Sequence, residues 1–265
     1  MTEHTREARP RVLTARKHPV LNALIYRLLV RTALQSSFHA VLLLQRAPLP
    51  PDDVPLILYG NHSSWWDAYV PMALNEERWQ RDGYVMVEET QLARYQFFRF
   101  CGGFSVDRHD LRKAMESLRY AVELLSSGTR RMLLIFPQGE IRANDQRPLG
   151  FHTGAARIAL HVAEQRGQCW LYPMALRYEF IGEQKPYAFI RIAEPIRVHA
   201  SEGYNARALT ACMEQALTQT LDALREDVIA YRFADYERLL SGMWSINRLW
   251  DAIRGKPQIR RVGGI

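Results

Sequence analysis

Residues 54–67, VPLILYGNHSSWWD, combine a short apolar run with a polar segment directly after it. The run over residues 54–59 has the length and composition of a buried strand. The polar segment brings a histidine, two serines and an aspartate together within six residues. The stretch therefore predicts a strand that ends in a polar loop, with the start of a helix behind it.

Outward from this strand, short apolar runs alternate with amphipathic stretches. Further strands are predicted over residues 84–87, 104–106, 132–136, 170–176 and 188–192, and helices over 110–126 and 154–164. This alternation predicts an α/β fold, a single domain with a central, mostly buried sheet flanked by helices. The helix-breaking residues 47–54 (APLPPDDV) mark the entry to that domain.

Both ends of the chain are predicted to be helical. Apolar side chains at a spacing of three to four over residues 19–44 predict N-terminal amphipathic helices behind a loose basic arm of about eighteen residues. Residues 206–231 and 233–253 are predicted as two helices of a C-terminal helical extension. We therefore divide the chain into 1–48 (arm and amphipathic helices), 49–200 (the α/β domain) and 201–265 (the extension).

Composition narrows the partners and the compartment. The formal net charge is +7, which suits membrane headgroups, acidic carrier proteins or other anionic partners. No nucleic-acid recognition motif and no metal-binding motif is present, so we expect neither partner. Three scattered cysteines and a polar N-terminus without a secretory signal pattern favour a cytoplasmic location. No run of 18 uninterrupted apolar residues occurs, so the terminal amphipathic stretches are expected to cover the core or to contact a membrane.

His62 and Asp67 are the candidate catalytic pair. Positions five apart on a regular helix lie about 140° apart around its axis, so two such residues do not meet there. They can meet if His62 lies in the loop and Asp67 in the first helical turn, with Ser63 or Ser64 as the N-cap. A carboxylate placed in this way prepares the imidazole to take a proton from an alcohol. The alternative interpretation is a capped helix start with a surface histidine.

Residues 61–67 also resemble the His-(four residues)-Asp block of the glycerolipid acyltransferases, the lysophosphatidic acid acyltransferase-like family. Further blocks follow in the family's order: residues 102–108 (GGFSVDR) are similar to Gly-x-x-Phe-Ile-x-Arg, 136–139 (FPQG) to the start of Phe-Pro-Glu-Gly-Thr-Arg, 151–155 (FHTGA) to Phe-Lys-x-Gly-Ala, and 171–175 (LYPMA) to the final apolar-Pro block. Together the blocks cover residues 54–176.

The resemblance implies an O-acyltransferase of phospholipid biosynthesis, similar to the 1-acylglycerol-3-phosphate O-acyltransferases. Such an enzyme takes its acyl group from acyl-CoA or an acyl-carrier protein, needs no cofactor, and works on a lipid acceptor. We expect it at the membrane surface, peripheral on the cytoplasmic face. The resemblance makes His62 the general base and Asp67 its partner. The residues that it implies for acceptor binding are Arg108, Gln138, Gly139, Glu140 and Arg142.

Several positions depart from the family's blocks. Ser105 and His152 stand where an apolar residue and a lysine are usual, and Gln138 replaces the glutamate of the third block. In the same block Glu140 replaces threonine, Ile141 occupies the arginine position, and Arg142 follows one residue later. Arginine binds phosphate through a rigid fork, so this shift matters. Either Arg142 takes over, or the acceptor lacks a glycerol-phosphate headgroup. We favour the second, with a glycolipid, a terpenoid alcohol or another hydroxylated lipid as acceptor.

Three alternatives remain open at the level of sequence. Arg108 could form a surface ion pair with Asp107 or Asp110 instead of binding a headgroup, although the basic balance of the chain favours the headgroup. The protein could be a non-catalytic, membrane-associated lipid-binding protein with a degenerate site. It could also be a CoA-independent transacylase or lipid hydrolase that uses His62. For a transferase, backbone N–H groups after His62 or in the turn at Gly139 are predicted to stabilise the oxyanion.

Overall fold

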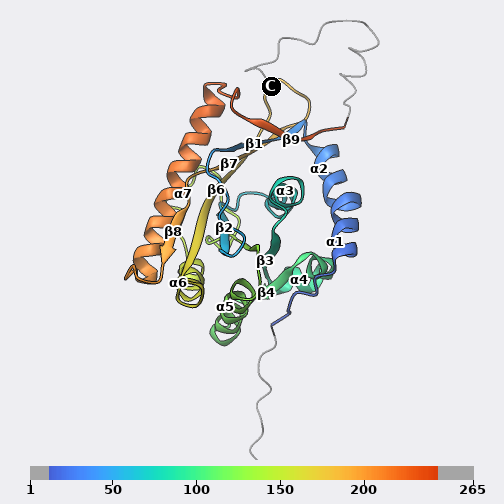
Figure 1. The fold of residues 1–265 in the computed structure, drawn as a ribbon. Helices are drawn as coiled ribbons and strands as arrows, with labels where there is room; N and C mark the ends of the chain where they lie inside the picture. Colours follow the sequence, from blue (N-terminus) through green and yellow to red (C-terminus); the bar gives the residue numbers. More distant parts are fainter. Residues whose placement is uncertain (1–11, 244–265) are drawn as a thin grey trace, which may run out of the picture.

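A mixed sheet forms the centre of the computed structural model, which describes residues 12–243 (Figure 1). Its nine strands are β1 (Ala40–Gln45), β2 (Leu56–Gly60), β3 (Asp82–Glu88), β4 (Gly103–Val106), β5 (Arg131–Ile135), β6 (Gln168–Glu179), β7 (Tyr187–Ile192), β8 (Ile196–His199) and β9 (Glu237–Ser241). They lie in the order β4-β3-β5-β2-β6-β7-β1-β9, with β8 paired to β6. The five strands from β4 to β6 are parallel, whereas β7 runs antiparallel to β6, β1 parallel to β7, and β9 antiparallel to β1.

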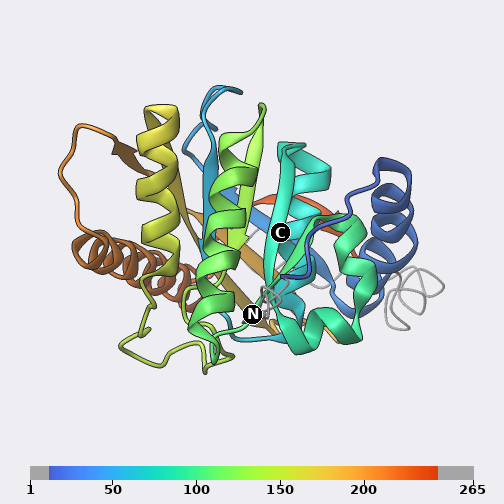
Figure 2. The same ribbon diagram turned by 90° about the horizontal axis from the view of Figure 1, so that it is seen from below.

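Helices cover both faces of this sheet. They are α1 (Pro19–Ile25), η1 (Tyr26–Val30), α2 (Arg31–Ser37), η2 (Trp65–Ala68), α3 (Tyr69–Leu74), η3 (Asn75–Trp79), α4 (Glu89–Arg94), η4 (Gln96–Cys101), α5 (Leu111–Ser126), α6 (Gly154–Arg166) and α7 (Ala206–Ile229). Helices α5, α6 and α7 pack on one face, while α3 and the N-terminal helices pack on the other. Figure 2 shows α7 and α1 at opposite edges of the molecule.

Strand β2 explains why its sequence reads as one continuous apolar run. Side chains alternate between the two faces of a strand. Ile57 and Tyr59 enter the core beneath α5, α6 and α7, whereas Leu56 and Leu58 enter the core beneath α3. All four are fully buried, as expected for a central parallel strand with helices on both sides.

The predicted fold class is confirmed. Every strand predicted from 54–59 to 188–192 is present within a few residues of its predicted bounds, and so are the helices α5, α6 and α7. Asp110 caps α5 by accepting the N–H groups of Arg112 and Lys113. The predicted break over residues 47–54 holds neither a helix nor a strand.

Two predicted helices extend over segments that are strands at one end of the sheet. The helical pattern of residues 19–44 ends at Ser37, and residues 40–45 form β1 between β7 and β9. Residues 237–241 form β9 instead of part of a helix over 233–253. The rest of that predicted helix, from residue 244, lies outside the described residues. Strand β1 comes from the predicted segment 1–48 and β9 from the predicted segment 201–265, and both belong to the same sheet as the strands of residues 49–200.

The described part of the N-terminal arm is bound to the domain, not loose. Residues 12–18 run in an extended conformation beside β4 and η4. Leu13 exchanges hydrogen bonds with Ser105: its N–H donates to the Ser105 hydroxyl, and its carbonyl accepts the Ser105 N–H. This clasp gives the unusual serine of the second block a structural reason.

The N-terminal helices carry apolar side chains on two sides. Tyr26, Val30 and Leu34 are buried against the sheet. Val20, Leu24, Leu28 and Leu29 project outward, each more than half exposed. Within residues 12–243, no helix has both the length and the apolar character needed to cross a bilayer.

Candidate active site

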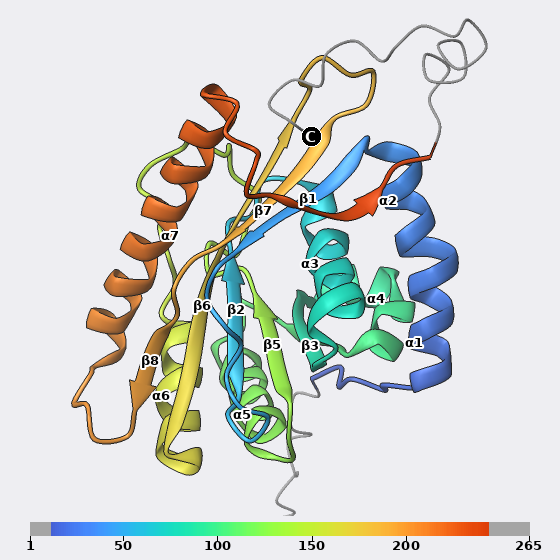
Figure 3. The ribbon, with the colours of Figure 1, turned by 45° about the horizontal axis from the view of Figure 1, so that its top comes forward.

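The candidate site residues gather at the carboxyl ends of neighbouring parallel strands. Strands β2, β5 and β6 run side by side in the same direction (Figure 3). Asn61 and His62 follow β2, and residues 136–142 follow β5. Arg108 follows β4, and Tyr178 lies near the end of β6. Parallel strands place their carboxyl ends at one edge of a sheet, which is where α/β folds build their sites.

Asn61 locks the loop that carries His62 onto β6. Its side-chain oxygen accepts the N–H of Leu176 at 2.8 Å, and its amide nitrogen donates to the carbonyl of Leu176 at 3.0 Å. The side chain thus replaces one rung of the backbone ladder where β2 ends. Local sequence patterns give no signal for these bonds, because the partner lies 115 residues away in the chain.

His62 and Asp67 meet as the spacing predicted. His62 Nδ1 lies 2.9 Å from Asp67 Oδ2. Ser64 is the N-cap of η2, and Asp67 reaches back to accept the N–H groups of Ser63 at 2.6 Å and Ser64 at 2.8 Å. Asp67 is fully buried, while the His62 side chain is 26% exposed. The pair therefore combines a shielded carboxylate with an imidazole that solvent or substrate can reach.

Tyr178 completes the surroundings of the carboxylate. Its hydroxyl donates to Asp67 Oδ1 at 2.6 Å. Burial, followed by the charge of Asp67, raises the pKa of Tyr178 well above its usual value, so the phenol keeps its proton and donates it. Sequence reasoning missed this residue, which lies two positions beyond the predicted end of its strand.

The third block wraps around the His62 loop. The Phe136 ring stacks on the His62 imidazole with ring centroids 4.7 Å apart. The side-chain oxygen of Gln138 accepts the His62 N–H at 2.7 Å, and the Arg142 N–H donates to the His62 carbonyl at 2.8 Å. Gln138 is buried, and its amide accepts the hydrogen bond without bringing a second buried charge next to Asp67.

Arg108 lies over Gly139 with its charge uncommitted. Gly139 has a φ of +72°, and a Cβ there would approach Arg108 Nη1 to 2.6 Å, so this position requires glycine. The alternative of a surface ion pair is wrong: Asp107 pairs with Lys113 at 3.4 Å, and Asp110 caps α5. Within residues 12–243 the exposed Arg108 side chain forms no hydrogen bond or ion pair.

Arg142, by contrast, is held in place. Its Nε and Nη2 lie 2.9 and 2.7 Å from Glu140 Oε1, and its Nη1 donates to the carbonyl of Leu149 at 3.1 Å. Arg142 first, then Arg108 and His152, lower the pKa of Glu140. The ion pair balances the charge of Arg142, which is consequently less available to a substrate phosphate.

The predicted oxyanion donors are in part already engaged. The N–H groups of Ser63 and Ser64 donate to Asp67, and the Gly139 N–H donates to the carbonyl of Phe136 at 2.9 Å. These three groups cannot also stabilise an oxyanion, so this expectation is wrong for them. In the part of the chain that the structure describes, no group of His, Cys, Asp and Glu side chains is arranged to hold a metal ion.

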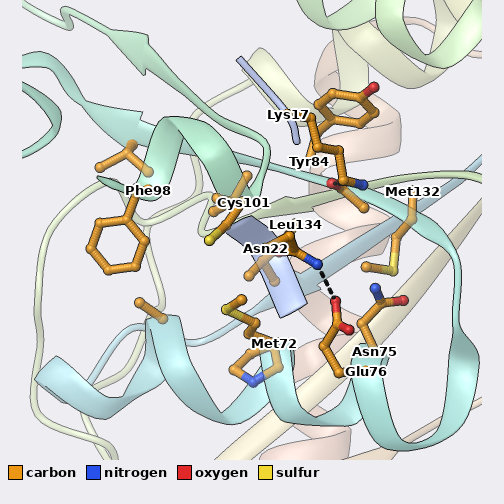
Figure 4. Close-up of a pocket in the computed structure, with 15 residues that line it drawn as sticks. Lys17, Asn22, Met72, Asn75, Glu76, Tyr84, Phe98, Cys101, Met132 and Leu134 are labelled. Atoms are coloured by element: carbon orange, nitrogen blue, oxygen red, sulfur yellow. Dashed lines mark hydrogen bonds between the residues drawn. The ribbon is translucent and has the colours of Figure 1, made fainter. Parts of the chain in front are cut away.

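An apolar pocket lies on the α3 face of the sheet. Its lining includes Ala68, which follows Asp67 in the chain. It includes Met72, Val85, Phe98, Cys101 and Leu134. Figure 4 shows Phe98 at one end and Lys17 and Tyr84 at another, with the Asn22 amide donating to Glu76 at 2.9 Å. The pocket is thus apolar along its walls and bounded by polar groups of the N-terminal segment.

Comparison with known proteins agrees with this geometry. The sequence model of the acyltransferase family matches residues 44–177, half of the chain. The chain is 28% identical over 116 residues to the 1-acyl-sn-glycerol-3-phosphate acyltransferase of Streptococcus pneumoniae (strain ATCC BAA-255 / R6), which is 42% of this chain and 39% of that protein. It is also 28% identical over 127 residues to a 1-acyl-sn-glycerol-3-phosphate acyltransferase of Chlamydomonas reinhardtii, 46% of this chain and 35% of that protein. The similarity thus spans well under half the length of these relatives. Because the family model matches half of the chain, this chain belongs to the acyltransferase family.

Proposed function

We propose that the protein is an O-acyltransferase that moves a fatty acyl group from an acyl thioester to a hydroxyl of a lipid acceptor. The observation that carries the proposal is the contact of 2.9 Å between His62 Nδ1 and the buried Asp67 carboxylate. A carboxylate on Nδ1 sets the tautomer of the imidazole and leaves Nε2 to accept a proton. His62 is then the general base.

The reaction is a direct transfer without an acyl-enzyme. His62 Nε2 takes the proton of the acceptor hydroxyl as its oxygen bonds to the thioester carbonyl carbon. The carbon–sulfur bond then breaks, and the departing thiolate recovers the proton from the imidazolium. The products are an ester and a free thiol, and His62 returns to its neutral form.

The apolar pocket beside η2 is the place that we assign to the acyl chain of the donor. Most of its lining residues are apolar, and they include Ala68, which follows Asp67 in the chain. Each Å² of apolar surface that an acyl chain buries there contributes about 25 cal/mol to the binding free energy. The donor is acyl-CoA or an acyl-carrier protein.

We assign the acceptor headgroup to the side where Arg108 lies over Gly139. Arg108 offers an uncommitted guanidinium for a polar headgroup, whereas Glu140 neutralises Arg142. This balance favours a hydroxylated lipid without a glycerol-phosphate group, such as a glycolipid or a terpenoid alcohol. Lysophosphatidate is the comparison substrate, since the named relatives are 1-acyl-sn-glycerol-3-phosphate acyltransferases.

We also propose that the protein works at a membrane surface, peripheral on the cytoplasmic face. The exposed Val20, Leu24 and Leu28 of the N-terminal helices support this, together with the net charge of +7. Such a combination of apolar and basic groups binds the interface of an anionic bilayer. Trp65, more than half exposed next to the catalytic loop, has the amphipathic ring that suits the same interface.

The test is thioester consumption by the purified protein with acyl-CoA or acyl-carrier protein and a panel of lipid acceptors. We expect His62→Ala to abolish acceptor-dependent turnover and to keep the fold and vesicle binding. His161→Ala is the matched control, because His161 is an exposed histidine paired with Glu164 on α6. Retained turnover in His62→Ala would show that His62 is not the general base. Lipid binding without turnover would favour the non-catalytic alternative, and turnover without a thioester would favour a transacylase or hydrolase.

A further inference from the structure

The end of strand β6 reaches the catalytic carboxylate from the side opposite His62. The Tyr178 backbone pairs with Ala188 of β7, which anchors the residue in the sheet. The Phe38 ring, fully buried at the end of α2, lies 5.6 Å from the Tyr178 ring and 5.1 Å from the Trp66 ring. The phenol is thus held both by its strand and by packing against its ring.

The hydrogen bonds of Asp67 are divided unevenly between its two oxygens. Oδ2 contacts His62 Nδ1 and the N–H groups of Ser63 and Ser64. Among the described residues 12–243, Oδ1 accepts only the Tyr178 hydroxyl, at 2.6 Å. Without that hydroxyl, a buried carboxylate oxygen would lose its partner, and rotation of the carboxylate toward another donor would become favourable.

We propose that Tyr178 is a positioning residue of the catalytic pair, and that its hydroxyl holds the Asp67 carboxylate in the plane that directs Oδ2 at His62 Nδ1. This inference rests on the proposed function. It goes beyond the family's blocks, because residue 178 lies one position past the segment that the family model matches. His62, Asp67 and Tyr178 thus form a group of three residues, in which Tyr178 orients Asp67 and Asp67 orients His62.

Tyr178 acts as a donor and not as a proton relay. Its phenol is buried next to a negative charge, which disfavours loss of its proton. The phenol consequently continues to donate to the Asp67 carboxylate, which keeps its orientation while the imidazole becomes positive. A fixed carboxylate stabilises that positive charge without having to reorganise. Preorganised electrostatic stabilisation of this kind is usually the largest contribution to an enzyme's rate enhancement.

Tyr178→Phe tests the proposal, with Tyr172→Phe as the matched control. Tyr172 lies on the same strand, is buried, and donates its hydroxyl to the Pro48 carbonyl at 2.6 Å, away from the site. We expect Tyr178→Phe to lower kcat by about tenfold, the value of one hydrogen bond to a charged group, with KM unchanged. Tyr172→Phe should change the melting temperature about as much as Tyr178→Phe does, and it should leave kcat unchanged.

Two further measurements separate positioning from a structural role. In the Asp67→Asn background, Tyr178→Phe should lower kcat by less than about twofold, because the group through which it acts is gone. Without any substrate, the His62 Nδ1–H proton resonance should shift in Tyr178→Phe and stay unchanged in Tyr172→Phe. An unshifted resonance, or equal kcat values for the two phenylalanine variants, would overturn the proposal. A shifted resonance in a protein without transferase activity would support the positioning and refute the proposed function.

Discussion

Asp67→Asn is the sharpest single test of the catalytic pair, because the carboxylate serves four donors at once. His62, Ser63 and Ser64 contact Oδ2, and Tyr178 donates to Oδ1. Asparagine offers one oxygen and one amide nitrogen at the same positions. The best fit keeps the oxygen at the Oδ2 position and turns the amide toward the phenol, which must then accept a hydrogen bond.

The magnitude follows from that replacement. The two backbone N–H groups keep an acceptor but lose its charge, which costs roughly 1 kcal/mol each and about 2 kcal/mol of unfolding free energy together. The larger effect falls on the reaction, since the imidazolium loses its counter-charge in a fully buried position. We expect kcat to fall by about 10²–10⁴-fold, or about 3–5 kcal/mol of transition-state stabilisation.

The assay is thiol release from an acyl thioester, with urea unfolding of the same preparations. Asp227→Asn is the matched control: Asp227 is a buried carboxylate that accepts the Tyr236 hydroxyl at 3.0 Å and pairs with Arg191 and Arg232. That variant should lose stability and keep its kcat once the folded fraction is counted. An Asp67→Asn protein that stays folded and retains kcat within tenfold of the parent would refute the assignment.

Three further predictions address the acyl chain, the acceptor and the membrane. Val85→Phe should fill the apolar pocket and lower kcat/KM for long-chain donors by about fourfold for each displaced methylene. Short-chain donors serve as the internal control, and equal losses for both would contradict the assignment of the pocket. Glu140→Thr should release Arg142 and raise the use of lysophosphatidate relative to neutral acceptors, a gain that Arg142→Ala must cancel. Leu24→Glu with Leu28→Glu should weaken binding to anionic vesicles, whereas Ile229→Glu, at an exposed apolar position on the opposite edge, should not; equal binding by both variants would argue against this membrane contact.

We propose that the choice of acceptor depends on the ion pair between Arg142 and Glu140. Arg142 stands one position after the arginine of the family pattern that the sequence resembles, and Glu140 pairs with it. Arg108 remains uncommitted over Gly139. Arg108 and Arg142 thus differ in their availability to an acceptor headgroup although they lie in the same region. The panel of lipid acceptors tests that difference.

Much of the architecture could be predicted from local patterns. The apolar run before Asn61, the alternation of runs and amphipathic stretches, and the spacing of His62 and Asp67 each depend on a few neighbouring residues. Strand and helix periodicity are local properties, and so is a carboxylate that reaches back over one capped turn. For this reason the fold class and the contact between His62 and Asp67 were accessible without coordinates.

Other features depend on partners far away in the chain. The segment 40–45 is as apolar as a buried helix, and only pairing with β7 and β9 makes it a strand. Asn61 bonds to Leu176 across 115 residues, and Tyr178 reaches Asp67 across 111. The sequence by itself determined the strands β2 to β7, the helices α5, α6 and α7, and the contact between His62 and Asp67, because short-range sterics and hydrogen bonds govern them. The tertiary structure alone decided the strands β1 and β9, the loop anchored by Asn61 and the contact of Tyr178 with Asp67, because the assembled sheet brings their partners together.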